Sequence, residues 1–124
     1  MPSETQQWGF DQEALAEEML CRGGYVIVER NWRGGGSEVD RIAFDGEILC
    51  FIEVRARRTQ SCGRPEETVG SSKRRHLVRA AMAYLTRFSP SKMPMVRFDV
   101  VSVLRGREDS PEVTLIVDAF DAGR

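Results

Sequence analysis

The sequence predicts a single α/β domain: a mixed β-sheet flanked by helices, in the order helix, three strands, helix, two strands. The 124 residues fit one domain of ordinary size, and the 41% hydrophobic and 30% charged residues allow a buried core beneath a charged surface. Two stretches carry apolar residues at helical spacing, and β-rich runs lie on both sides of the second. A helical crossover between strands favours a parallel pair there. We expect one domain over residues 1–124, with disordered tails at about 1–8 and 121–124.

The first elements are a helix from Thr5 to Arg22 and a short strand from Tyr25 to Val28. Gly23 and Gly24 supply the helix stop. Residues 30–33 are expected to lead out of the strand into Gly34–Gly36. This glycine run matches no phosphate-binding fingerprint, so we interpret it as a flexible connection.

A β-hairpin is predicted on either side of Asp45-Gly46, because Asp-Gly favours a two-residue type I′ turn. With these two residues as the loop, Asp40 lies opposite Phe51. Side chains alternate between the faces of a strand, so one face gathers several charged residues. This face carries Glu38, Asp40, Glu53 and Arg55. Asp40 and Glu53 become diagonal neighbours roughly 7–8 Å apart, close enough to share a metal ion.

The shared face predicts a magnesium site, since Mg²⁺ takes oxygen ligands and keeps several waters. Asp40 and Glu53 would hold the ion, with the carbonyl of Val54 as a further ligand. Arg55 would point at a phosphate, and Glu38 or Glu13 would supply an auxiliary carboxylate. A surface salt-bridge cluster without metal is the alternative that spacing alone leaves open.

After the hairpin we expect a polar loop over residues 59–70 and a helix capped by Ser71 or Ser72 and running to about Phe88. Residues 89–94 break that helix. Met95–Leu104 and Val113–Val117 are the last two strands.

Basic residues are concentrated in one segment although the net charge is only −1. Eight lysines and arginines but two acids lie between Arg55 and Arg79. Cations at a helix N-terminus are unfavourable, so an anionic ligand or simple solvent exposure must explain those that start the second helix. If the ligand is a nucleic acid, Arg57, Arg58, Lys73, Arg74 and Arg75 would form the contact.

Other features narrow the class of protein. Cys21, Cys50 and Cys62 show no C-x-x-C spacing, which argues against a disulfide framework or a zinc site. His76 is expected to be a surface residue rather than a proton shuttle. With no long apolar run and no signal-peptide pattern, we expect a cytoplasmic protein with no membrane partner.

Several motifs, spread from Gly9 to Phe120, resemble the YraN family, also called UPF0102. They are Arg30–Arg33, Ser37–Ala43 (SEVDRIA), Phe51–Arg57 (FIEVRAR) and Arg97–Val101. The family is described as predicted endonucleases of the restriction-endonuclease-like PD-(D/E)XK superfamily, similar to archaeal Holliday-junction resolvases. The chain departs from the family motif at Ser37, usually glycine, and at Arg41, usually apolar. Because Arg41 lies on the face away from the acids, we expect it to be exposed or to reach a partner subunit.

The resemblance implies a Mg²⁺- or Mn²⁺-dependent endonuclease acting on DNA, including branched or structured DNA, and by analogy a homodimer. Glu13, Asp40 and Glu53 match the superfamily acids, whereas Arg55 stands where the superfamily has lysine. An arginine cannot act as a general base, because its pKa exceeds about 12. We therefore hypothesise that Lys73 contributes a movable ammonium instead. The alternatives are a nucleic-acid-binding protein of nuclease fold without catalysis and an interaction module with structural acids.

Overall fold

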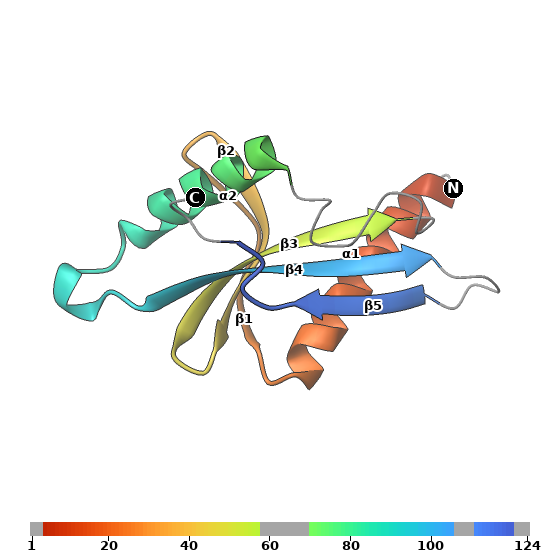
Figure 1. Ribbon diagram of the computed structural model, residues 1–124, viewed down its shortest axis with the longest axis horizontal. Helices are drawn as coiled ribbons and strands as arrows, with labels where there is room; N and C mark the ends of the chain where they lie inside the picture. The colour runs from red at the N-terminus through yellow and green to blue at the C-terminus, as the bar shows by residue number, and fades with distance from the viewer. Residues whose placement is uncertain (1–3, 58–69, 106–110, 121–124) are drawn as a thin grey trace.

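The computed structural model describes residues 4–57, 70–105 and 111–120 (Figure 1). Within these ranges the order of elements is the expected one. The elements are α1 (Glu4–Arg22), β1 (Val26–Gly34), β2 (Ser37–Asp45), β3 (Ile48–Arg57), α2 (Ser71–Leu85), the 3₁₀ helix Pro90–Lys92, β4 (Met95–Arg105) and β5 (Pro111–Ile116).

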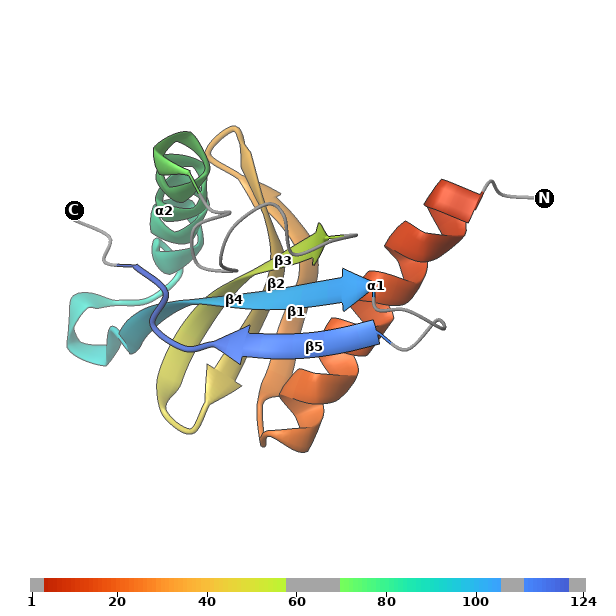
Figure 2. The ribbon, with the colours of Figure 1, turned by 45° about the vertical axis from the view of Figure 1, so that its right-hand side comes forward.

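The five strands form one mixed sheet in the order β1-β2-β3-β4-β5. Neighbouring strands are antiparallel except β3 and β4, which are parallel and are connected through α2 (Figure 2). The predicted α/β class and the parallel pair at the helical crossover are therefore confirmed.

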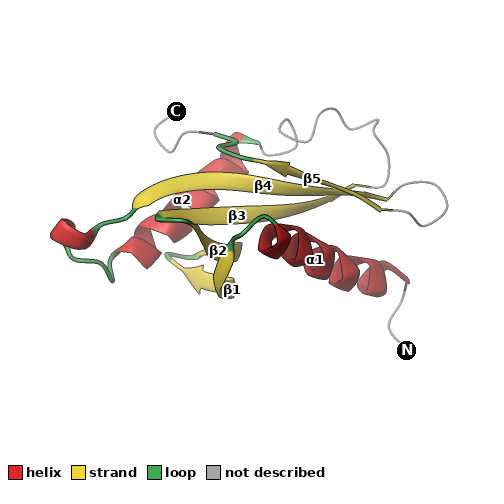
Figure 3. Ribbon diagram, turned by 90° about the horizontal axis from the view of Figure 1, so that it is seen from below, coloured by secondary structure: helices red, strands yellow, loops and turns green. Residues whose placement is uncertain are grey.

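The two helices cover opposite faces of the sheet, as Figure 3 shows. Each face has its own hydrophobic core. The core on the α2 side consists of Val39, Ile42, Leu49, Phe51, Leu77, Ala80, Ala81, Tyr84, Phe98, Val100 and Phe120. The core on the α1 side consists of Ala16, Leu20, Tyr25, Ala43, Cys50, Ile52, Val101 and Val103. The central strands are buried on both faces, which explains why β3 and β4 are the most continuously apolar runs in the sequence.

A buried polar network ties the strand that follows α1 to the middle of the sheet. Asp99 is fully buried and accepts hydrogen bonds from the Tyr25 hydroxyl (2.7 Å) and from Arg97 (2.9 Å). Burial alone would raise the pKa of Asp99, but its hydrogen bonds to Arg97, the Asp118 backbone and Tyr25 outweigh burial and hold the pKa below its ordinary value. Arg97 also pairs with Asp45 at 2.8 Å.

The first hairpin is longer than expected. Residues 30–33, predicted to leave the strand, continue β1 and pair with β2, with Trp32 opposite Val39. Trp32 packs edge-on against Tyr84 of α2, with 5.1 Å between ring centroids. The turn is confined to Gly35 and Gly36, which both have positive φ, so the glycine run is a tight hairpin turn.

The register of the second hairpin differs from the prediction by two residues. Asp45 pairs with Ile48, so the two-residue loop is Gly46-Glu47 rather than Asp45-Gly46. Of these residues only Gly46 has positive φ, which places glycine at the first loop position, as in type II′ turns. A shift by an even number leaves every side chain on its predicted face.

Smaller differences concern the ends of the helices. Gly70 is the N-cap of α2 and no side chain caps the helix, so the predicted caps Ser71 and Ser72 are wrong. The helix ends at Leu85 rather than Phe88, and the predicted break contains the 3₁₀ helix. α1 begins at Glu4, inside the expected tail. The remaining tail residues, most of the predicted loop 59–70 and Cys62 lie outside the described residues.

No helix in the described part of the chain combines the length and apolar character that crossing a bilayer requires.

Candidate active site

Asp40 and Glu53 meet where the β2–β3 ladder ends. The last registered pair is Arg41 with Ile52, and continuing by one residue places Asp40 directly opposite Glu53. The Asp40 carboxylate accepts a hydrogen bond from the backbone N–H of Val54 at 2.8 Å. A side chain thus takes the place of a backbone acceptor and fixes the Asp40 carboxylate against β3. The predicted juxtaposition is present, although the two residues are opposite rather than diagonal.

The electrostatics of this pair are those of two acids sharing one site. Burial raises the pKa of Asp40, and the neighbouring Glu53 carboxylate raises it further, to about 7. The N–H of Val54 and the charge of Lys73 act in the opposite direction. Glu53 is only 5% exposed. Two carboxylates that repel each other, one buried and one partly buried, favour a cation between them.

Lys73 supplies a cation from the first turn of α2. Its Nζ lies 2.8 Å from Oε1 of Glu53. The Glu53 side chain is 7% exposed and that of Lys73 is 45% exposed, so the ammonium approaches the acid from the solvent side. This ion pair offsets the unfavourable position of a lysine at a helix N-terminus.

Arg41 is a site residue that sequence reasoning misplaced. It is 6% exposed and neither solvated nor free to reach a partner, which corrects the expectation. Its Nη1 donates to the Asp40 carbonyl at 2.7 Å, and its guanidinium pairs with Glu17 at 3.1 Å and Glu13 at 3.5 Å. The i, i+4 spacing places both glutamates on one face of α1, where their like charges favour a cationic partner.

Glu13 therefore reaches the site indirectly. It pairs with Arg41 on the α1 side of the sheet, whereas Lys73 meets Glu53 from α2 on the other side. The structure brings Asp40, Glu53 and Lys73 together and places Glu13 behind Asp40, where it supports the strand through Arg41.

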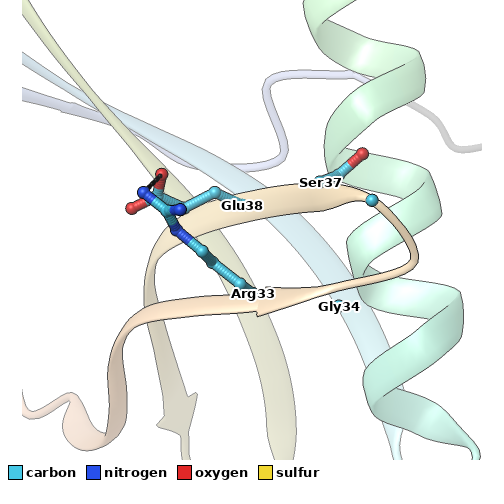
Figure 4. A pocket seen from close by; sticks show the side chains of 5 residues that line it. Arg33, Gly34, Ser37 and Glu38 are labelled. Atoms are coloured by element: carbon cyan, nitrogen blue, oxygen red, sulfur yellow. Dashed lines mark ion pairs between the residues drawn. The ribbon is translucent and has the colours of Figure 1, made fainter.

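Glu38 lies further along β2, beside a shallow hollow (Figure 4). It pairs with Arg33 across the β1–β2 hairpin at 3.4 Å. The hollow has a volume of about 580 Å³, and its described lining is Arg33, Gly34, Gly36, Ser37 and Glu38. The Ser37 hydroxyl points toward α2 and lies 3.3 Å from Nδ1 of His76, which is exposed as predicted.

The predicted basic residues are not equally accessible. Arg55 is partly buried and stands two residues beyond Glu53, so alternation places it on the same face. Arg57 is buried, at 8% exposed. Arg74 lies over the ring of Phe120, 5.5 Å from its centroid. Arg75 is exposed, and Arg58 lies outside the described residues.

The donor set at Asp40 and Glu53 fits a hard divalent ion with few protein ligands. Within the described residues no group of three or more His, Cys, Asp or Glu side chains could hold a metal. Mg²⁺ commonly binds through one or two carboxylates and keeps waters and phosphate oxygens as its other ligands. The mutual repulsion that raises the pKa of Asp40 is the property that a divalent cation would relieve.

Comparison with known proteins gives one consistent result. The model of the uncharacterised protein family UPF0102 matches residues 12–103. A UPF0102 protein of Desulfosudis oleivorans is 43% identical over 122 residues, which cover 98% of this chain and 96% of the relative. A UPF0102 protein of Symbiobacterium thermophilum is 44% identical over 110 residues, covering 89% and 92%. A Chlorobium limicola UPF0102 protein is 38% identical over 125 residues, covering 97% and 96%.

Proposed function

The chain belongs to the uncharacterised family UPF0102, and from this premise we propose that it is a metal-dependent endonuclease that hydrolyses phosphodiester bonds in DNA. The observation that carries the proposal is the pair of carboxylates fixed at the end of the β2–β3 ladder, with the Lys73 ammonium 2.8 Å from one of them. The similarity of the motifs to PD-(D/E)XK nucleases supports it, and branched or structured DNA is the proposed substrate.

Each residue of the site has a distinct proposed role. Asp40 and Glu53 would hold Mg²⁺ or Mn²⁺ with the Val54 carbonyl, and the ion would supply Lewis-acid activation of water and of the phosphate. Arg55 and the Lys73 ammonium would stabilise the negative charge that develops on the phosphate as water attacks phosphorus and the ester oxygen leaves. Arg41 would position Asp40 through its backbone carbonyl, with Glu13 and Glu17 orienting the guanidinium.

The position of Lys73 addresses the arginine at residue 55. Nucleases of this superfamily are expected to carry a lysine there, and an arginine cannot accept a proton near neutral pH. In this chain the Lys73 ammonium reaches the Glu53 carboxylate from α2. A lysine on the helix therefore supplies the amine that the strand lacks at residue 55.

The test of the proposal is cleavage of branched, single-stranded and linear DNA in Mg²⁺, Mn²⁺ or EDTA. We expect metal-dependent cleavage that falls at least about a hundredfold in Asp40→Asn, because the variant loses a charged ligand but keeps the side-chain shape and an acceptor for the Val54 N–H. Glu112→Gln, an exposed change on β5, is the matched control and should cleave normally. Undiminished cleavage by Asp40→Asn would rule out this site.

A second candidate is a nucleic-acid-binding protein that retains the fold without catalysis, favoured by the arginine at position 55. It predicts DNA binding that weakens with salt but no cleavage in either metal. The same assay separates the two functions.

A further inference from the structure

In the Glu53–Lys73 ion pair the glutamate is held within the sheet, whereas the lysine side chain can move. Glu53 lies in the central strand β3 and is 5% exposed. Lys73 projects from the first turn of α2, with 45% of its side chain exposed. A lysine has a flexible four-carbon stem and a single charged nitrogen, so its ammonium can move several ångströms while the helix stays in place.

The ammonium lies against the carboxylate that a divalent ion would need. It is 2.8 Å from Oε1 of Glu53, and its charge also acts on Asp40. A divalent ion held by Asp40 and Glu53 would strongly repel a unit positive charge so close to it, because the site is largely shielded from water. Lysine and metal thus compete for the same negative charge.

We infer that in the metal-free protein the Lys73 ammonium occupies the place beside Glu53 that a divalent ion would take. A divalent ion that binds there displaces the ammonium toward the solvent side, where the DNA phosphate would bind. This inference rests on the proposed function only in taking Asp40 and Glu53 as the metal ligands. Lys73 then has two successive partners: the Glu53 carboxylate before the metal binds and a phosphate oxygen afterwards.

Two consequences follow for the metal-free protein. Without Lys73, the buried Glu53 carboxylate and the partly buried Asp40 carboxylate lack their neutralising cation, so the fold is less stable. The same site binds a divalent ion more tightly, because no ammonium has to leave. Loss of Lys73 should therefore weaken the metal-free fold and strengthen metal binding. If Lys73 served only as a structural partner or as a phosphate contact, its loss would not strengthen metal binding.

The experiment is a Mn²⁺ titration of the full chain without DNA, with free Mn²⁺ followed by electron paramagnetic resonance at pH 8.5, above the pKa of about 7 of Asp40. We expect the dissociation constant to fall at least about tenfold in Lys73→Met and to stay near wild type in Lys73→Arg, which keeps the charge. Lys92→Met removes an equal charge from the exposed 3₁₀ helix and is the matched control. Thermal melting should show a larger Mn²⁺-induced rise in Lys73→Met than in wild type.

The possible failures are distinguishable. Equal Mn²⁺ affinity in wild type and Lys73→Met, with binding lost in Asp40→Asn, would overturn the displacement of Lys73 and leave the metal site intact. Mn²⁺ binding that is absent from every variant, or that persists in Asp40→Asn, would overturn the metal site and with it both proposals. Tighter binding in Lys73→Arg as well would overturn the competition between charges, because arginine keeps the positive charge at this position.

Discussion

At the scale of single residues, Asp40 is held in an environment that disfavours its charge. Burial and the carboxylate of Glu53 raise its pKa to about 7, against about 3.9 in an unfolded chain. Between these values the folded protein retains a proton that the unfolded chain has released. The contribution of Asp40 to the free energy of unfolding therefore falls as the pH rises from about 4 to about 7, and stays low above that.

Replacing this acid by its amide should stabilise the metal-free protein. We expect Asp40→Asn to raise the free energy of unfolding by about 1–3 kcal/mol at pH 8, and by little at pH 4, where the wild-type acid is protonated in the folded state and still about half protonated in the unfolded chain. Urea denaturation in EDTA at both pH values measures the difference, with Glu112→Gln as control. A variant less stable than wild type at pH 8 would show that the Asp40 charge stabilises the fold.

The same residues show what the sequence could and could not predict. Alternation along two strands was enough to place Asp40 and Glu53 on one face, even though the predicted turn was one residue out and the register two, because an even shift of register preserves faces. The pairing of Lys73 with Glu53 depends on how α2 is set against the sheet, which no local pattern determines. Arg41 was misplaced because its partners lie on another element, α1.

At the scale of elements, the tip of the β1–β2 hairpin is fitted closely to α2. Gly35 has a φ of +62°, and a Cβ at this position would lie 3.1 Å from the Arg79 carbonyl oxygen and 3.3 Å from Cβ of Ala83. Gly36 has a φ of +75°, but a Cβ there would have no neighbour within 4 Å. A side chain at Gly36 would meet only the cost of a positive φ, whereas one at Gly35 would also be crowded against α2.

Substituting alanine at each position measures the free-energy cost of crowding a side chain at residue 35 against α2. Gly36→Ala should destabilise by about 1 kcal/mol through its positive φ, and Gly35→Ala by about 1–2 kcal/mol more, because α2 or the turn must also shift. Urea denaturation of both variants gives the difference. Equal losses would mean that the hairpin tip and α2 are not in firm contact.

Element boundaries were predictable where the signal was local. The glycine run was interpreted as a flexible connection and not as a hairpin turn. β1 was predicted to end before residues 30–33, because Arg-Asn-Trp-Arg has no strand pattern of its own. Pairing with β2 and the packing of Trp32 on Tyr84 extend the strand. The helix cap was missed because the backbone of Gly70 can occupy the N-cap without a side-chain bond.

At the scale of the whole molecule, a near-neutral chain keeps its basic residues together. The net charge is −1, yet Lys73, Arg74 and Arg75 follow one another near the start of α2. The fold separates their roles, since Lys73 pairs with Glu53, Arg74 lies over Phe120 and Arg75 is exposed. Arg75 is therefore the cleanest probe of a phosphate contact.

The salt dependence of DNA binding tests this assignment. If Arg75 contacts a phosphate, Arg75→Gln should weaken binding and reduce the slope of log affinity against log salt by about 1. Fluorescence anisotropy with labelled DNA, in EDTA to prevent cleavage, gives the slope. Lys92→Gln, near the other end of α2, should leave the slope unchanged. An unaltered slope in Arg75→Gln would exclude that contact.

The fold class was predictable because composition, periodicity and the helical crossover all pointed to one mixed sheet. The placement of α1 and α2 on opposite faces could not be read from the sequence in the same way, since both helices are amphipathic and either can cover either face. The structure shows which face each helix covers, because α1 and α2 contribute to two separate hydrophobic cores.

The parallel pairing of β3 with β4 has a consequence for the order in which the site assembles. The β2–β3 hairpin closes through a two-residue loop and is expected to form within about 1–10 μs. The β3–β4 pairing joins Ile48 to Met95 across the whole crossover, and such non-local contacts form later. The carboxylates are thus brought together by a fast local closure, whereas their neutralising ammonium arrives with the slow crossover. During folding, the two carboxylates of the site are therefore adjacent before the Lys73 ammonium can neutralise them.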